Sequence, residues 1–120
     1  MKLRTRDVLI VEDDTAIAEL YSLRLRMDGF TVHHASDVTT AHVIFDRARP
    51  AVICVDARLR GASGLPAAAE FAELGATVLL LTNDQDSFES PPVGVARALL
   101  KARTSPSELA IAIAELTRVR

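Results

Sequence analysis

Acidic side chains follow two short apolar runs of this 120-residue chain, and their types and positions are suited to phosphate chemistry. Glu12, Asp13 and Asp14 come directly after one run, and Asp56 comes directly after another. Carboxylates that meet repel one another, so either their pKa values rise or a cation neutralises them. Mg²⁺ prefers a few carboxylates together with water or phosphate oxygens. A carboxylate can also attack phosphorus itself and form an aspartyl-phosphate. The acids therefore favour Mg²⁺-assisted phosphoryl transfer.

A hydroxyl group and an ammonium group complete a set of donors for this reaction. Thr82 and Lys101 end two further apolar runs. A transferring phosphoryl group spreads negative charge over its oxygens, which Mg²⁺ and a lysine can stabilise. Acid pairs are often only helix caps, and a lone lysine is usually solvated. Four such features at successive strand ends are much less expected by chance, so we interpret them as one site.

A sheet is needed to bring these side chains together, and the chain has a pattern for one. Five apolar runs are predicted to be strands, at residues 8–11, 30–34, 51–55, 77–81 and 95–100. The first run is continuous rather than alternating, as expected for a strand covered on both faces. Segments with helical spacing lie between the runs, at residues 15–28, 38–49 and 65–74. A last helix is predicted from Pro106, behind a capping box of Ser105 and Glu108.

This alternation predicts an α/β fold with a doubly wound, five-stranded parallel sheet and helices on both faces. The expected strand order is 2-1-3-4-5, in which ligands bind at the carboxyl ends of strands one and three. The acids at these two ends should therefore converge. Residues 83–93 carry the weakest pattern, with Pro91, Pro92 and only Phe88 as a large apolar residue. We therefore expect a short or irregular fourth helix.

Composition narrows the classes of protein that fit. The length predicts a single domain over residues 1–120. The formal net charge of −2 gives no reason to expect direct nucleic-acid binding or attraction to an anionic membrane. Cys54 is the only cysteine, which excludes an internal disulfide and fits a reducing compartment. No apolar stretch has the length of a membrane span. We therefore expect a cytoplasmic domain that contacts no membrane.

Motifs spread over nearly the whole chain carry a resemblance to a known family. They are Val8-Leu9-Ile10-Val11-Glu12-Asp13-Asp14, Gly29-Phe30, the run that ends at Asp56, Gly61, Gly64-Leu65, Leu81-Thr82 and Lys101. The set resembles the response-regulator receiver domain of two-component signalling, a domain with a flavodoxin-like fold. The opening motif and the Asp–Thr–Lys order are together fairly specific for it.

The resemblance implies a role for each residue of the predicted metal site. Asp13 would bind Mg²⁺ directly, and Glu12 would bind it through water. Asp56 and the backbone carbonyl of Arg58 would complete the protein ligands. Asp14 would instead cap the first helix.

The resemblance also implies the reaction and the partners. Asp56 would accept a phosphoryl group from a histidine kinase or a phosphotransfer protein, while Thr82 and Lys101 contact the phosphoryl oxygens. The change would be transmitted to a downstream protein or to a fused output domain. The domain would be a signalling phosphoacceptor with self-phosphorylation and autodephosphorylation chemistry, not an enzyme.

Several residues depart from the usual pattern of receiver domains. Arg60 and Ala102 stand where the family usually has proline, Asn83 where it has a small residue, and Ala98 where it has Tyr or Phe. The segment between Thr82 and Lys101 is also shorter than usual. We expect Asn83, Asp84 and Ala98 to modulate the lifetime of the phosphate and its output.

Two other functions remain open on the sequence. The departures favour a pseudo-receiver, a protein-interaction module that switches weakly or not at all. A small Mg²⁺-dependent phosphatase would also use an aspartyl nucleophile. Such an enzyme needs a second acid two residues after Asp56, where this chain has Arg58.

Overall fold

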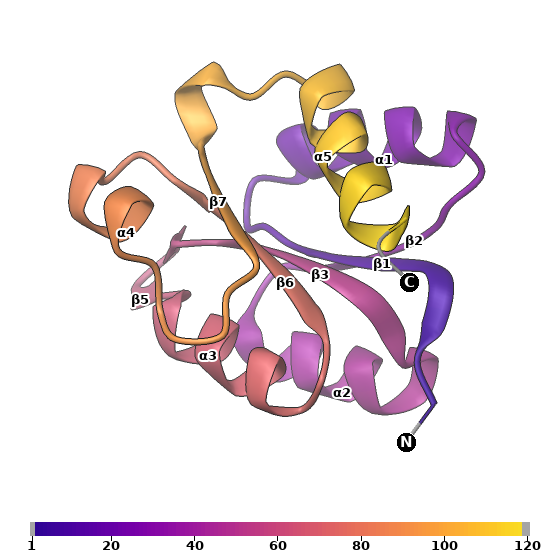
Figure 1. Ribbon diagram of the computed structural model, residues 1–120, viewed down its shortest axis with the longest axis horizontal. Coiled ribbons are helices and arrows are strands. Elements are labelled where there is room, and N and C mark those ends of the chain that lie inside the picture. Colours follow the sequence, from indigo (N-terminus) through magenta and orange to yellow (C-terminus); the bar gives the residue numbers. More distant parts are fainter. Residues whose placement is uncertain (1, 119–120) are drawn as a thin grey trace.

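A five-stranded parallel sheet forms the centre of the computed structural model, which describes residues 2–118 (Figure 1). Its strands are β1 (Arg4–Val11), β2 (Thr31–Ala35), β3 (Pro50–Asp56), β6 (Thr77–Thr82) and β7 (Arg97–Leu100). The order across the sheet is β2-β1-β3-β6-β7, and every neighbouring pair is parallel. This is the predicted 2-1-3-4-5 order, so the doubly wound topology is confirmed.

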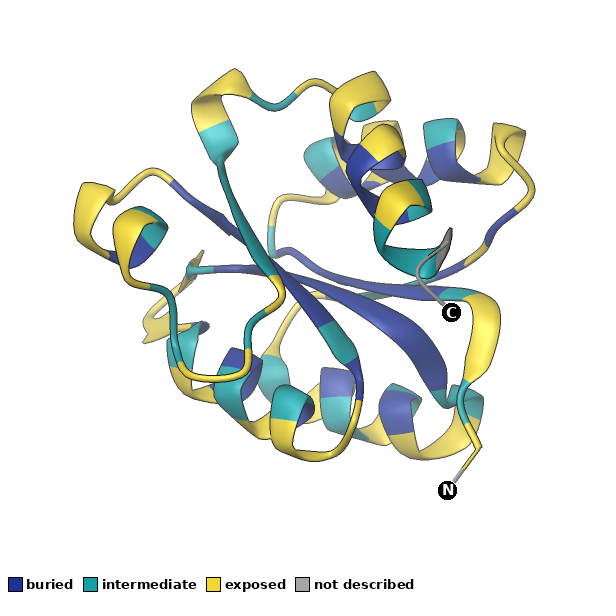
Figure 2. Ribbon diagram, viewed as in Figure 1, coloured by how far each residue is buried: buried dark blue, intermediate teal, exposed yellow. Residues whose placement is uncertain are grey.

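Helices cover both faces of this sheet. Helices α1 (Thr15–Met27) and α5 (Pro106–Arg118) lie on one face, and α2 (Val38–Ala48) and α3 (Leu65–Glu73) lie on the other (Figure 1). Successive strand residues point to opposite faces, so Leu9 packs with the α2 and α3 side while Ile10 packs with the α1 and α5 side. Burial on both faces explains why the central strands are continuously apolar (Figure 2).

Side-chain caps define where several helices begin. Asp14 accepts a hydrogen bond from the Ile17 N–H at the start of α1, at 3.2 Å. Ser105 and Glu108 form the predicted capping box of α5, with N–H to side-chain distances of 3.1 and 2.9 Å. These short-range signals are local to the sequence, so they could be recognised there.

Three features differ from the sequence prediction, of which the smallest is that β7 begins at Arg97 and not at residue 95. Strand β1 begins at Arg4, earlier than predicted, because Arg4 pairs with Pro50 of β3 although the first residues of the strand are polar and exposed. A small hairpin of β4 (Arg58–Leu59) and β5 (Ala62–Ser63) follows β3 and was not predicted. Gly61 takes the left-handed conformation in its turn, with φ of 71°. The hairpin lies directly beside the acids.

The fourth helix is short, as predicted. Helix α4 (Gln85–Glu89) is about one and a half turns long, and Pro91 and Pro92 follow it. Within α4 only Ser87 is buried, and Phe88 is half-buried. A 3₁₀ turn, η1 (Lys101–Arg103), follows β7. Helix α4 therefore makes few apolar contacts with the edge of the sheet at β7.

Candidate functional site

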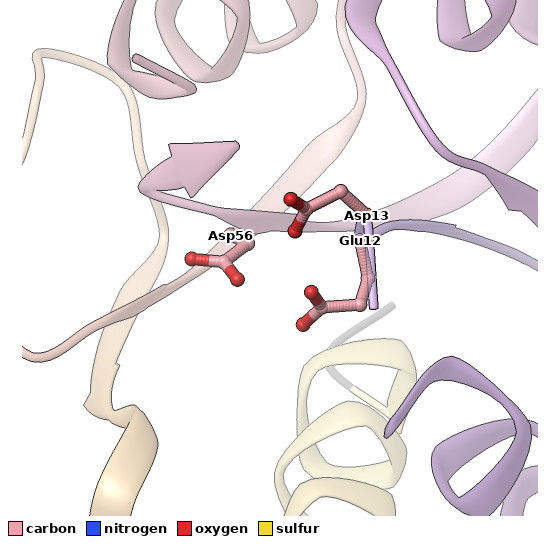
Figure 3. A group of neighbouring side chains, drawn as sticks. All are labelled: Glu12, Asp13 and Asp56. Atoms are coloured by element: carbon pink, nitrogen blue, oxygen red, sulfur yellow. The ribbon is translucent and has the colours of Figure 1, made fainter. Parts of the chain in front are cut away.

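Three carboxylates converge at the carboxyl ends of β1 and β3 (Figure 3). Glu12, Asp13 and Asp56 each offer one oxygen, and these oxygens all lie within 4.8 Å of one another. The two strands are neighbours, with Val11 beside Val55 in the register. Glu12 and Asp13 directly follow β1, while Asp56 is the last residue of β3. The convergence follows from the strand order that the sequence predicted.

The three acids differ in exposure, and this sets their electrostatics. Glu12 is 1% exposed and Asp56 is 4% exposed, whereas Asp13 is half-buried. Burial raises the pKa of Glu12. Hydrogen bonds from Lys101 and from the Asp14 N–H act in the opposite direction, and the charge of Asp56 raises this pKa further. Lys101 and the Asp14 N–H therefore offset only part of the cost of burying a negative charge on Glu12.

Lys101 supplies the positive charge of this cluster. Its Nζ donates a hydrogen bond to Asp56 Oδ2 and lies 2.8 Å from Glu12 Oε1. Burial alone would lower the pKa of Lys101, but the hydrogen bonds to Asp56 and Glu12 outweigh it and raise this pKa above its ordinary value. Lys101 is therefore a firmly charged ammonium group that bridges the acids of two strands.

Asp56 has a partner on each carboxylate oxygen. The Arg58 N–H donates to Oδ1 at 3.0 Å, while Lys101 contacts Oδ2. Asp56 also lies between two hollows. The first hollow has a volume of about 910 Å³ and is lined by Glu12, Asp13 and Arg58, among others. The second has a volume of about 690 Å³, and Thr82 is among the residues that line it. Space for a phosphoryl group therefore exists beside the carboxylate.

Thr82 lies near Asp56, but its hydroxyl is hydrogen-bonded to other residues. It is the last residue of β6, and the preceding Leu81 is opposite Asp56 in the register. Thr82 Oγ1 lies 2.7 Å from Ser87 Oγ and accepts the Asp84 N–H at 3.0 Å. Ser87 could not be identified from the sequence, because nothing local distinguishes it from the exposed Ser90.

The three residues expected to modulate the site occupy different places. Asn83 is exposed, and its Oδ1 accepts the Ala102 N–H at 2.8 Å, which a proline at that position would lack. The Lys101–Ala102 peptide bond is trans. Asp84 caps α4 by accepting the Ser87 N–H at 2.9 Å. Ala98 is half-buried on β7 and packs on the side of the sheet with α2 and α3.

The donors present fit a hard divalent cation. All three groups offer oxygen, and Mg²⁺ is commonly held by one or two carboxylates while it keeps several waters. The half-buried Asp13 and the adjoining hollow leave room for that water. The buried charge of Glu12 is a further reason for a cation here, since a cation would offset its repulsion from Asp56.

Gly64 lies directly against the backbone of Asp56, and its replacement by alanine is expected to be costly. A Cβ at this position would lie 2.0 Å from the Asp56 carbonyl oxygen and 3.1 Å from Val55 Cγ1. We expect Gly64→Ala to lower the free energy of unfolding by about 3 kcal/mol, the upper range for overpacking. Gly75→Ala is the control, because its new Cβ meets open space and only its φ of 97° is unfavourable, at a cost of about 1–2 kcal/mol. Equal midpoints of urea unfolding for the two variants would contradict this role of Gly64.

Comparisons with known proteins agree with this geometry. Residues 8–113 match the family model of the response regulator receiver domain. TcrX of Mycobacterium tuberculosis, a probable transcriptional regulatory protein, is 36% identical over 90 residues, which are 73% of this chain and 38% of TcrX. The DNA-binding response regulator MtrA of the same species is 29% identical over 83 residues, 68% of this chain and 36% of MtrA. The chain thus spans less than two fifths of the length of these relatives.

Solved structures share the fold over nearly the whole chain. A CheY-like receiver domain from Methanospirillum hungatei superposes with a TM-score of 0.84 at 22% identity, over 98% of this chain and 95% of the other. The response regulator TrrA from Thermotoga maritima was solved in complex with Mg²⁺ and BeF. It superposes with a TM-score of 0.80 at 23% identity, over 92% of this chain and 98% of the other. At such identities the likeness concerns the fold. No helix within residues 2–118 is long and apolar enough to cross a membrane.

Proposed function

This chain belongs to the response regulator receiver domain family, and from this we propose that Asp56 is the phosphoacceptor of a two-component phosphorelay. The observation that carries the proposal is the convergence of Asp56 with two further acids and the charged Lys101 at the carboxyl ends of β1 and β3. No other place in the described chain brings three possible metal ligands together.

The phosphoryl donor in the proposed reaction is a phosphohistidine. An Asp56 carboxylate oxygen attacks phosphorus, the new O–P bond forms, and the P–N bond of the donor breaks. The electron pair of that bond stays on the imidazole nitrogen, which takes up a proton. Bound Mg²⁺ supplies positive charge against the phosphoryl oxygens. Glu12 and Asp13 would hold it, with Asp56 and the Arg58 carbonyl as the remaining protein ligands.

Lys101 and Thr82 act on the phosphoryl group once it is attached. Lys101 already contacts Asp56, so a small shift carries its ammonium group to a phosphoryl oxygen. The Thr82 hydroxyl donates to another oxygen after it leaves Ser87. The added charge shifts the equilibrium of the loops that carry these two residues. The domain therefore acts as a signalling phosphoacceptor rather than as an enzyme with its own substrate.

Partners follow from the same proposal. The donor is a histidine kinase or a phosphotransfer protein, and the receiver of the signal is a downstream protein or a fused output domain. The names of TcrX and MtrA support regulation of transcription as the output, and this chain matches less than two fifths of the length of each. Direct contact with nucleic acid is not assigned to this domain, whose formal net charge is −2. We propose a cytoplasmic location, as the donor and the output require.

Intact mass measurement tests the proposal. Incubation with phosphoramidate or acetyl phosphate and Mg²⁺ should add the mass of one phosphoryl group, and EDTA should prevent the addition.

A protein that gains no such mass would instead be a pseudo-receiver, the second candidate. That candidate is favoured by Ala98 and by the short α4, which offer little for an ordinary output face. A phosphatase is disfavoured by Arg58, whose side chain cannot act as a general acid.

Asn83→Ala is expected to shorten the lifetime of the phosphate by a few-fold. Asn83 closes one side of the acceptor's hollow and ties its loop to Ala102. Without it, water reaches the phosphoryl group more easily, and the loop loses one hydrogen bond worth about 1 kcal/mol. The decay of the phosphorylated mass with time measures this effect. Gln85→Ala, which removes an exposed side chain bonded to Glu89, is the control and should decay like the parent. A lifetime that is unchanged or longer in Asn83→Ala would contradict the assignment.

A further inference from the structure

The buried hydrogen bond between Thr82 and Ser87 joins the acceptor site to α4. Thr82 is 2% exposed and Ser87 is 7% exposed, and their hydroxyl oxygens lie 2.7 Å apart. Ser87 is the one buried residue of α4. The helix therefore has its main buried link to the sheet through this pair of hydroxyl groups.

Either hydroxyl could donate in this hydrogen bond, and counting protons favours one direction. Ser87 Oγ donates its single proton to the Asp84 carbonyl oxygen, at 3.3 Å. With Thr82 as the donor to Ser87, both hydroxyl protons are used, and the Thr82 oxygen accepts the Asp84 N–H. Three residues thus form a closed ring of hydrogen bonds at the start of α4. In this state the Thr82 proton points to Ser87.

A phosphoryl group on Asp56 competes for the same proton. Its oxygens are charged acceptors, and hydrogen bonds to charged groups are roughly twice as strong as those between neutral groups. Thr82 has one hydroxyl proton and cannot donate it to both acceptors. Within residues 2–118 its hydroxyl makes no hydrogen bond to Asp56, so donation to a phosphoryl group requires the Thr82 proton to turn away from Ser87.

We propose that Ser87 is the positioning residue that holds the Thr82 hydroxyl in the unphosphorylated state and releases α4 when Thr82 turns to the phosphoryl group. The inference rests on Asp56 being the phosphoacceptor. Loss of the bond leaves Ser87 with only its neighbours in the Asp84 cap, and α4 has no other buried side chain to hold it. Ala98, opposite Leu80 on the adjoining strand, has only a methyl side chain, which cannot make such a hydrogen bond instead. The signal therefore leaves the site through a serine on α4.

Binding of beryllofluoride with Mg²⁺, a stable mimic of the phosphoryl group, tests this role. In the proposed switch Thr82 donates to Ser87 only in the free state, so removal of this bond favours the bound state. Ser87→Ala should bind beryllofluoride about fivefold more tightly than the parent, the factor that one net hydrogen bond gives. Ser87→Thr keeps a hydroxyl and should bind like the parent, as should Ser90→Ala, which alters an exposed serine. A merely structural role for Ser87 would give weaker or unchanged binding in Ser87→Ala, and either result would overturn the proposal.

The variant Thr82→Val allows two further tests. One is a double-mutant cycle with Ser87→Ala, and the other is an NMR measurement on the protein without beryllofluoride. In the Thr82→Val background, Ser87→Ala should no longer change the affinity for beryllofluoride. In the metal-free protein, the NMR signals of α4 in Thr82→Val should move in the direction that beryllofluoride moves them in the parent. Unmoved α4 signals would overturn the proposal even if Ser87→Ala fails to fold. Failure of the function itself looks different, because the parent would then show no Asp56-dependent binding of beryllofluoride, which would refute both proposals.

Discussion

Asp13→Ala is expected to abolish the response of the protein to Mg²⁺ and to slow phosphorylation by at least roughly 100-fold, or about 2.7 kcal/mol in activation free energy. Asp13 is the least buried of the three acids and faces the hollow where water can complete the coordination of a metal. NMR titration with Mg²⁺ measures the first effect, and the rate of phosphate incorporation from phosphoramidate measures the second. Metal-free Asp13→Ala should also melt at a higher temperature than the parent, because it removes one of three clustered negative charges.

Asp14→Asn is the matched control for that variant. Asp14 is the next residue in the chain and is also acidic, but its carboxylate caps α1 at Ile17. Asparagine caps helices about as well as aspartate, so the change removes a neighbouring charge and keeps the fold. Its Mg²⁺ titration and phosphorylation rate should stay close to those of the parent. An unchanged titration in Asp13→Ala, or an equal loss in Asp14→Asn, would contradict the assignment of Asp13 as the metal ligand.

Asp56→Asn should eliminate phosphorylation altogether. The amide has nearly the same size and keeps an oxygen to accept the Arg58 N–H, but it is a poor nucleophile and loses the negative charge that pairs with Lys101. Intact mass after incubation with phosphoramidate and Mg²⁺ should therefore equal that of the untreated variant. Asp46→Asn makes the same chemical change on the exposed side of α2 and should be phosphorylated like the parent. Labelling of Asp56→Asn at the parental rate would show that another residue accepts the phosphate.

The fold and the acid cluster could be predicted because their signals are local and periodic. Continuous apolar runs identify strands that are buried on both faces, and the alternation with helices leaves few topologies. Once β1 and β3 are neighbours, Glu12 and Asp13 must meet Asp56 at one edge of the sheet. The cap of α1 and the capping box of α5 depend on residues three apart, so the sequence also displays them.

The features that the sequence did not reveal depend on contacts between separate segments. Ser87 acquires its role only because α4 lies against the end of β6, where the Thr82 hydroxyl reaches it. Asn83 could be identified as an unusual residue, but its bond to the Ala102 N–H joins two loops that are far apart in sequence. The β4–β5 hairpin consists of two-residue strands, which are too short to show any alternation.

Peptide mapping of the phosphorylated parent tests the central claim most directly. Trypsin, which does not cleave before Pro50, releases residues 48–58, and Asp56 is the only acidic side chain in that peptide. Borohydride reduces an aspartyl-phosphate to homoserine and so marks the acceptor permanently. After incubation with phosphoramidate and Mg²⁺, we expect the mark in this peptide alone, at position 56, and none when EDTA replaces Mg²⁺. A mark at any other carboxylate, or no mark while Mg²⁺ is present, would contradict the assignment of Asp56 as the phosphoacceptor.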